Sequence, residues 1–138
     1  MKEIMNTAQL AIASLGGAIG AVLGGWDGFL YALVLFVVVD YITGIMAAYV
    51  KKKISSQVGF HGILKKIVIF CLVAVGYVID AYIIKNGAVV RTAVIFFYMS
   101  NEGISILENA AVIGLPVPEK LRDVLEQLKD KVNGEDIS

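Results

Sequence analysis

The sequence predicts an all-α integral membrane protein, built as a helical bundle of four membrane-spanning helices followed by a short charged helix. The first observation is composition: 58% of the 138 residues are hydrophobic and only 17% are charged, whereas soluble domains have about 45–50% apolar and 25% charged residues. A domain of this size buries only about two-thirds of its surface, so water is a poor solvent for such a chain. The second observation is that the apolar residues fall into four long runs.

Each of these runs is close to the roughly 20 residues that a helix needs to cross the hydrocarbon layer. Segments rich in glycine or charge separate them, as expected of turns. The first run is weakly hydrophobic and rich in small residues, and the fourth is long enough to tilt or to be interrupted. The predicted membrane-spanning helices cover residues 7–25, 29–50, 63–84 and 88–115.

Beyond Pro116 and Pro118, residues 119–132 are predicted to form an amphipathic helix that is too short and too charged to span a membrane. Its apolar side chains recur at helical spacing and share one face. They are Leu121, Val124, Leu125, Leu128 and Val132. The chain is therefore divided into a transmembrane domain, residues 1–118, and a charged cytoplasmic helix and tail, residues 119–138.

Basic residues predict the orientation, because positively charged loops stay on the cytoplasmic side. With four spans, every Lys and Arg except Lys85 and Arg91 falls on one side, which places both termini in the cytoplasm. If the first segment lies along the surface instead, three spans remain and the N-terminus is outside. The residues that determine this topology lie around the loop between the second and third spans. They are Lys51, Lys52, Lys53, Lys65 and Lys66.

Small residues suggest where helices pack closely. Gly16, Gly20 and Gly24 follow one another at four-residue spacing, which puts them on one helix face and lets another backbone approach. Gly44 lies in the second span on the face that carries Asp40 and Thr43. The glycine row serves either self-association or packing within the chain, and the sequence leaves both open.

The predicted spans also carry an unusual number of polar side chains. A carboxylate near the centre of a membrane helix costs about 2.5–3.5 kcal/mol, so such groups face other helices or water. One interpretation is that they line a pore or make contacts between subunits. The candidates are Asp40 and Thr43 in the second span and Asn101, Glu102, Ser105, Glu108 and Asn109 in the fourth. A proton or ion relay, and a bundle held together by polar contacts, are the alternatives.

Other classes of function have little support in the sequence. The lone histidine, His61, and the lone cysteine, Cys71, cannot form a typical metal site, and no cofactor is expected. Glu102 and Glu108 point in diverging directions from one helix, which is poor geometry for shared acid–base catalysis. The formal net charge is zero, which gives no reason to expect nucleic acid as a partner.

Four ordered runs of residues resemble the phage lysis and toxin-secretion holins of Gram-positive bacteria and their phages. The runs are DYITG at residues 40–44, SSQVGFHGILKK at 55–66, NEGISILEN at 101–109 and GLPVP at 114–118. The order of these features and the charged tail match the family over nearly the whole chain.

This resemblance implies a non-enzymatic protein that accumulates in the cytoplasmic membrane and associates with copies of itself and with lipids. At a programmed time it would open lesions that release a cell-wall hydrolase (an endolysin) or a toxin. The alternative is a small ion-coupled transporter or channel subunit.

Overall fold

The computed structural model describes residues 2–133 and, within that range, the side chains of residues 6–130. In this part of the chain every regular element is a helix, which confirms the predicted all-α class. The helices are α1 (Lys2–Val22), α2 (Gly28–Val50), α3 (Ser56–Val78), the π-helix η1 (Ile79–Ile84), α4 (Val89–Ile113) and α5 (Glu119–Asn133).

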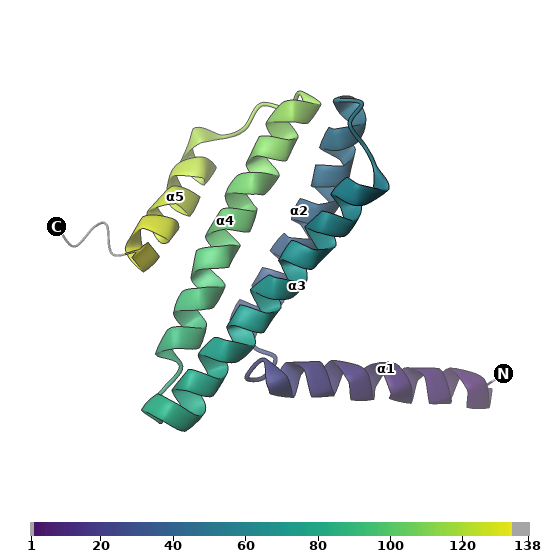
Figure 1. Cartoon of the computed structure of the whole chain (residues 1–138), viewed down its shortest axis with the longest axis vertical. Helices are drawn as coiled ribbons and strands as arrows, with labels where there is room; N and C mark the ends of the chain where they lie inside the picture. The colour runs from purple at the N-terminus through teal and green to yellow at the C-terminus, as the bar shows by residue number, and fades with distance from the viewer. Residues whose placement is uncertain (1, 134–138) are drawn as a thin grey trace.

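The helices α2, α3 and α4 form a bundle, α5 folds back along α4, and α1 projects sideways from one end (Figure 1). Among the described residues, two helical stretches are long and apolar enough to cross a membrane, Gly28–Val50 and Ser56–Ile84, the second being α3 continued by η1. They correspond to the second and third predicted spans. The count of four spans therefore stays a prediction.

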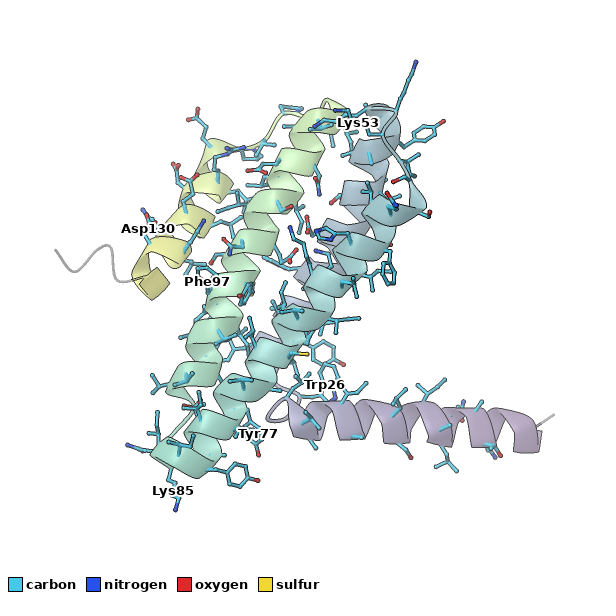
Figure 2. The ribbon with its side chains drawn as sticks, viewed as in Figure 1. Trp26, Lys53, Tyr77, Lys85, Phe97 and Asp130 are labelled. Carbon is cyan, nitrogen blue, oxygen red and sulfur yellow. The ribbon has the colours of Figure 1, made fainter. Side chains whose placement is uncertain are left out.

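The core lies where α2 packs against α4, the most extensive contact between helices. Leu30, Leu33 and Ile95 are fully buried there, and the rings of Phe29 and Phe96 meet edge to face at 5.0 Å. The side chains on the outward faces of the bundle (Figure 2) are also largely apolar: Leu35 is 59% exposed and Ile67 54% exposed. Large apolar side chains on the outside of a bundle suit a lipid surrounding better than water.

The helix α3 begins at Ser56, well before the start predicted at residue 63. Ser55 caps it, because its Oγ accepts a hydrogen bond from Val58 N at 3.1 Å. The glycines that suggested a turn are instead positions of close packing against α2. A Cβ at Gly59 would lie 3.3 Å from the Tyr41 hydroxyl, and one at Gly62 would lie 3.4 Å from the Tyr41 ring. The predicted loop is therefore too long by the first two turns of α3.

The turn between α1 and α2 is tied to α4 by Arg91, of which only 4% is exposed. Its Nε donates to the Leu23 carbonyl at 2.6 Å, its Nη2 to the Gly25 carbonyl at 2.9 Å, and its Nη1 to the Asp27 carboxylate at 2.7 Å. Gly24 and Gly25 have φ values of +95° and +105°, which favour glycine. The direction of α1 is thus set by a glycine turn and one arginine.

The N-terminus of α4 is capped from a distance by Asp80. Its two carboxylate oxygens accept hydrogen bonds from Val90 N at 3.0 Å and Arg91 N at 2.8 Å, two backbone donors that the helix itself cannot satisfy. Asp80 lies in η1. This π-helix ends at Ile84, and the next residue, Lys85, has a left-handed backbone conformation. The acidic residue near the end of the third predicted span therefore stabilises the turn into α4.

The helix α5 packs its amphipathic face on α4 only in part. Leu125 is buried against Gly103, whereas Leu121 and Val124 are 47% and 46% exposed. The Val132 side chain, predicted to share this face, and the predicted tail, residues 134–138, lie outside the described residues.

Candidate functional site

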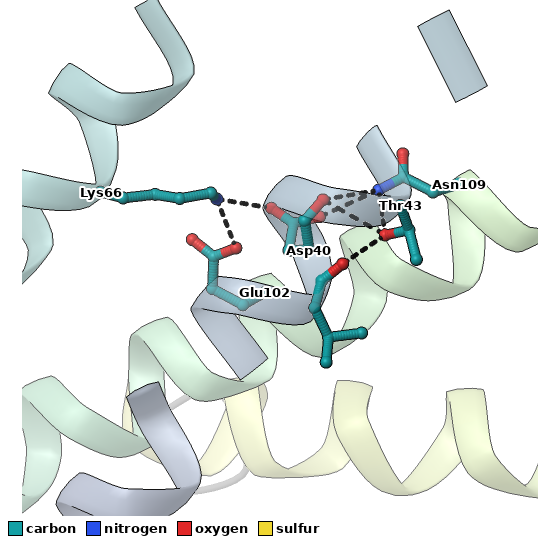
Figure 3. Close-up of polar contacts among 6 residues, drawn as sticks. Asp40, Thr43, Lys66, Glu102 and Asn109 are labelled. Atoms are coloured by element: carbon teal, nitrogen blue, oxygen red, sulfur yellow. Dashed lines mark hydrogen bonds and ion pairs between the residues drawn. The ribbon is translucent and has the colours of Figure 1, made fainter. Parts of the chain in front are cut away.

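Three charged side chains from three different helices meet inside the bundle (Figure 3). Lys66 of α3 places its Nζ 2.7 Å from Asp40 Oδ2 of α2 and 2.9 Å from Glu102 Oε2 of α4. The side chains of Lys66, Asp40 and Glu102 are only 15%, 12% and 8% exposed. One ammonium group therefore holds two carboxylates together.

This Asp40–Lys66–Glu102 cluster lies deep along the helices. Each residue is about three turns, or roughly 16 Å, from the nearer end of its helical segment. Charges at such depth are removed from water. Their ion-pair partners replace the lost hydration only while those partners stay in place. The cluster also carries two formal negative charges against one positive charge. An arrangement of this kind is a polar centre within an apolar bundle.

Asn109 extends the cluster toward the end of the bundle that carries the Lys51–Lys53 loop. Its Nδ2 donates to Asp40 Oδ1 at 3.0 Å and to Thr43 Oγ1 at 2.9 Å. Thr43 in turn donates to the Val39 carbonyl at 2.8 Å, so its hydroxyl serves both helices. Gly44 lies beside Asn109, where an added Cβ would be 3.7 Å from Nδ2, an ordinary contact.

The remaining polar candidates of the fourth predicted span divide into two groups. Asn101 and Ser105 line an open cavity of about 560 Å³ between α3 and α4, which also contains Asp40, Lys66 and Glu102. Glu108 is exposed and takes no part in the cluster. The structure thus brings together Asp40, Thr43, Asn109 and Glu102, with Asn101 and Ser105 beside them, and leaves Glu108 apart.

Of the predicted glycine row, Gly16 and Gly20 lie in α1, whereas Gly24 lies in the turn after it, where the helix has already ended. The contacts of these glycines are with residues of their own chain. The Trp26 indole Nε1 donates to the Gly16 carbonyl at 2.9 Å, and a Cβ at Gly20 would overlap the same indole. A Cβ at Gly24 would lie 2.7 Å from Arg91 Nε and 2.8 Å from the Tyr77 ring. Self-association through this row stays a prediction.

The lysines expected to set topology differ in exposure and in their distance from the loop between α2 and α3. Lys51, Lys52 and Lys53 are exposed at the loop between α2 and α3, and Lys65 is exposed on α3. Lys66, by contrast, lies inside the bundle. The reason is the early start of α3, which moves Lys66 from a flank to a position about three turns into the helix.

Sequence reasoning missed the polar cluster at the opposite end, which joins Arg91 to Asp27. Burial raises the pKa of Asp27, but the hydrogen bonds from Arg91 and Leu30 and the positive charge of Arg91 outweigh it and hold the pKa below its usual range. The sequence separation of Asp27 and Arg91 hides the pair. The local signal that was available is an Asp just before an apolar run, the usual position of a helix N-cap.

Comparisons with known proteins agree with the resemblance in the sequence. The model of the bacteriophage holin family matches residues 17–130. An uncharacterized 14.9 kDa protein of Clostridium perfringens is 39% identical over 131 residues, covering 95% of this chain and 99% of the relative. An uncharacterized protein of Listeria monocytogenes is 42% identical over 128 residues, covering 93% of this chain and 90% of the relative.

A third relative, named a probable holin, comes from Bacillus phage phi105. It is 34% identical over 125 residues, which cover 91% of this chain and 87% of the relative. No solved structure matches this chain. Because the family model covers most of the chain, and apolar helices and a phage relative aligned over 91% of the chain agree with it, this chain belongs to the bacteriophage holin family.

Proposed function

We propose that this chain acts as a holin: it accumulates in the bacterial cytoplasmic membrane, associates with copies of itself, and opens lesions that release an endolysin or a toxin. Family membership and the phage relative named a probable holin support this function. The observation that carries the mechanism is the Asp40–Lys66–Glu102 cluster inside an apolar bundle. No reaction is catalysed in this proposal.

The proposed mechanism is an exchange of polar partners. In the closed subunit, Asp40, Glu102 and Asn109 are satisfied within the chain. Polar contacts between membrane helices are worth only about 0.6 kcal/mol on average, so partners in a neighbouring subunit can replace them at small net cost. The helix α3 has little contact with α2 and open cavities beside Lys66. Its displacement would turn the polar faces of α2 and α4 toward a growing lumen.

For topology we propose that α2, α3 with η1, and α4 cross the membrane, with Lys51–Lys53 in the cytoplasm. A fourth crossing by α1 requires it to swing about Gly24 and Gly25 from the direction in Figure 1. A protease site added before α1 discriminates the two. With four spans it is cleaved only from the cytoplasmic side, and with α1 along the outer surface only from outside.

Paired variants test the function. Glu102→Gln removes one charge from the cluster, and Glu108→Gln removes an exposed charge from the same helix. Co-expressed with an endolysin, the Glu108 variant is expected to stop growth as abruptly as the unaltered chain. The Glu102 variant is expected to change the time of lysis and the size of the crosslinked assemblies. If both variants lyse cells on schedule with unchanged assemblies, the cluster plays no part in lysis.

An ion-coupled transporter remains the rival, because acid and base side chains on three helices are also what a relay requires. Expression without an endolysin separates the two functions. A holin depolarises the membrane abruptly after a delay, whereas a transporter gives a graded, substrate-dependent flux from the start.

A further inference from the structure

The helix α1 runs across the long axis of the bundle, at the end of α2 opposite to the Lys51–Lys53 loop (Figure 1). Between these two ends α2 has 23 residues, which span about 34 Å, close to the roughly 30 Å of a hydrocarbon layer. When the lysine loop lies at one membrane interface, α1 therefore lies at the level of the other. Trp26 and Tyr31 at this junction (Figure 2) are 45% and 68% exposed, and such rings favour an interface.

One face of α1 is apolar and exposed. Its residues recur at alternating spacings of four and three, which places them on one side of a helix. They are Ala8, Ile12, Leu15, Ile19 and Val22, and the last four are 45–72% exposed. The opposite face carries Asn6, Ala13 and Gly17, with Leu10 between them. A helix with this division suits an interface, where its apolar face lies on acyl chains.

The apolar face of α1 points to the side on which the bundle runs. An open groove of about 560 Å³ lies in the corner between α1 and the bundle. Its lining includes Ile19, Val22 and Trp26 on one side and Ile67, Phe70 and Cys71 of α3 on the other. These α3 residues precede Tyr77, which lies against the Gly24 turn, so the groove is on the side of α1 that faces the Lys51–Lys53 loop.

This corner groove has the chemistry of a lipid contact. Its lining side chains are hydrophobic, and the Trp26 Nε1 already donates to the Gly16 carbonyl. Ile67, which is 54% exposed on the outward face of the bundle, also lines the groove. The groove therefore continues the outward apolar surface of the spanning helices. Because Arg91 holds the carbonyls of Leu23 and Gly25, the corner is a fixed part of the fold.

We propose that α1 is an anchor in the outer membrane interface: its apolar face lies on the acyl chains of the outer leaflet, and the corner groove holds the acyl chain of a phospholipid. This inference rests on the proposed location in the membrane and needs no assembly or lesion. It deepens the proposed topology, because α1 then does not cross the bilayer and the N-terminus lies outside.

Depth measurements test the position of α1. In a Cys71→Ser background, needed since Cys71 is exposed, a fluorophore is attached at Leu15→Cys or Ala13→Cys. The full chain is diluted in phosphatidylcholine vesicles whose lipids carry a nitroxide quencher near the headgroup or near the chain end. The Leu15→Cys label is expected to be quenched several-fold more by the shallow nitroxide than by the deep one. The Ala13→Cys label, on the opposite face, is expected to be quenched weakly by both.

Two other results overturn the anchor. Stronger quenching of the Leu15→Cys label by the deep nitroxide indicates that α1 spans the bilayer, and weak quenching by both indicates that it lies in water. A label at Val38→Cys separates this inference from the proposed location, because Val38 is 47% exposed near the middle of α2. A deep Val38→Cys label together with either result overturns the anchor alone. A Val38→Cys label in water removes the proposed location in the membrane as well.

Trp26 reports on the groove itself, because it is the single tryptophan of the chain. In vesicles of phosphatidylcholine brominated on its acyl chains, the fluorescence of Trp26 is expected to be quenched. Cys71→Phe fills the groove and is expected to lower the quenched fraction. Val75→Phe is the matched control, because Val75 is one turn further along α3, is 53% exposed and does not line the groove. Equal quenching in the two variants overturns the binding of an acyl chain in the groove, whatever depth the Leu15→Cys label reports.

Discussion

Lys66 Nζ on α3 lies 2.7 Å from Asp40 Oδ2 on α2, and this ion pair joins two helices that also meet where Tyr41 lies against Gly59 and Gly62. The same ammonium reaches Glu102 on α4 at 2.9 Å. One side chain therefore ties α3 to both of its neighbours, next to the apolar contact that Ile69 and Val73 make with the core.

Replacing Lys66 by Met is expected to lower the free energy of unfolding by about 3–5 kcal/mol, because two buried carboxylates lose their common partner. Lys65→Met is the control, since Lys65 is the exposed neighbour on the same helix. Denaturant unfolding of the detergent-solubilised chain measures both. Adding Asp40→Asn to Lys66→Met should restore part of the loss. Equal effects of the two lysine variants would show that the ion pair contributes nothing to stability.

Gly103 is expected to resist even a methyl group. A Cβ there would lie 2.9 Å from both Leu125 methyl carbons and 3.2 Å from the Phe36 ring, so the buried Leu125 side chain has to move. We expect this movement to shift α5 as well, at a cost of about 1–3 kcal/mol. Gly44→Ala is the control, because its nearest contact is 3.7 Å away. Limited proteolysis reports α5: Gly103→Ala should release it faster, and adding Leu125→Ala should reverse the effect. Cleavage unchanged by Gly103→Ala would mean that α5 adapts without moving.

Asp80 is expected to matter as a cap of α4. Asp80→Ala leaves Val90 N and Arg91 N without an acceptor and should lower stability by about 1–2 kcal/mol. Asp80→Asn keeps one acceptor oxygen and should cost less. Thermal unfolding followed by circular dichroism ranks the two variants against Asp123→Ala, an exposed position on α5. A loss no greater than that of the Asp123 variant would contradict the capping role.

The all-helical class followed from the sequence because apolar runs of membrane length have few other solutions. The second span, predicted at 29–50, agrees with α2 to within one residue at its start. The start of α3 did not follow, because Gly59 and Gly62 look like turn residues when their packing partner is unknown. Tyr41, which requires them to be small, is far away in the sequence.

The candidate site was predictable as a list of residues but not as a cluster. Asp40, Glu102 and Asn109 stood out because polar side chains are costly in membrane helices. The sequence predicts a position for Lys66 at the flank of a span, whereas its pairing depends on the register of α3 against both neighbours. Helical spacing predicts that Glu108 lies on the same face of the fourth span as Ser105. In the structure Ser105 is partly buried beside the cluster, whereas Glu108 is exposed. Helical periodicity predicts which residues share a face, but only the packing of the helices determines which of them contact α2 and α3.

The contact between Asp27 and Arg91 predicts an acid-sensitive direction of α1. The pKa of Asp27 in the folded chain lies below its ordinary value of 3.8. The contribution of Asp27 to stability is therefore fully present above pH values near 3.8 and is lost as the pH falls through the lower folded-state pKa. Below it, Arg91 loses its charged partner, although its bonds to the Leu23 and Gly25 carbonyls persist.

Spin labels on α1 and at the start of α4, in the Cys71→Ser background, measure the result as a distribution of distances. The distribution should broaden on acidification. Asp27→Asn should be broad at every pH and show no acid-dependent step, because its side chain no longer titrates. Glu108→Gln, which removes an exposed carboxylate elsewhere, should keep the step. A step that persists in the Asp27 variant would assign the acid sensitivity to another group and leave the direction of α1 to the glycine turn alone.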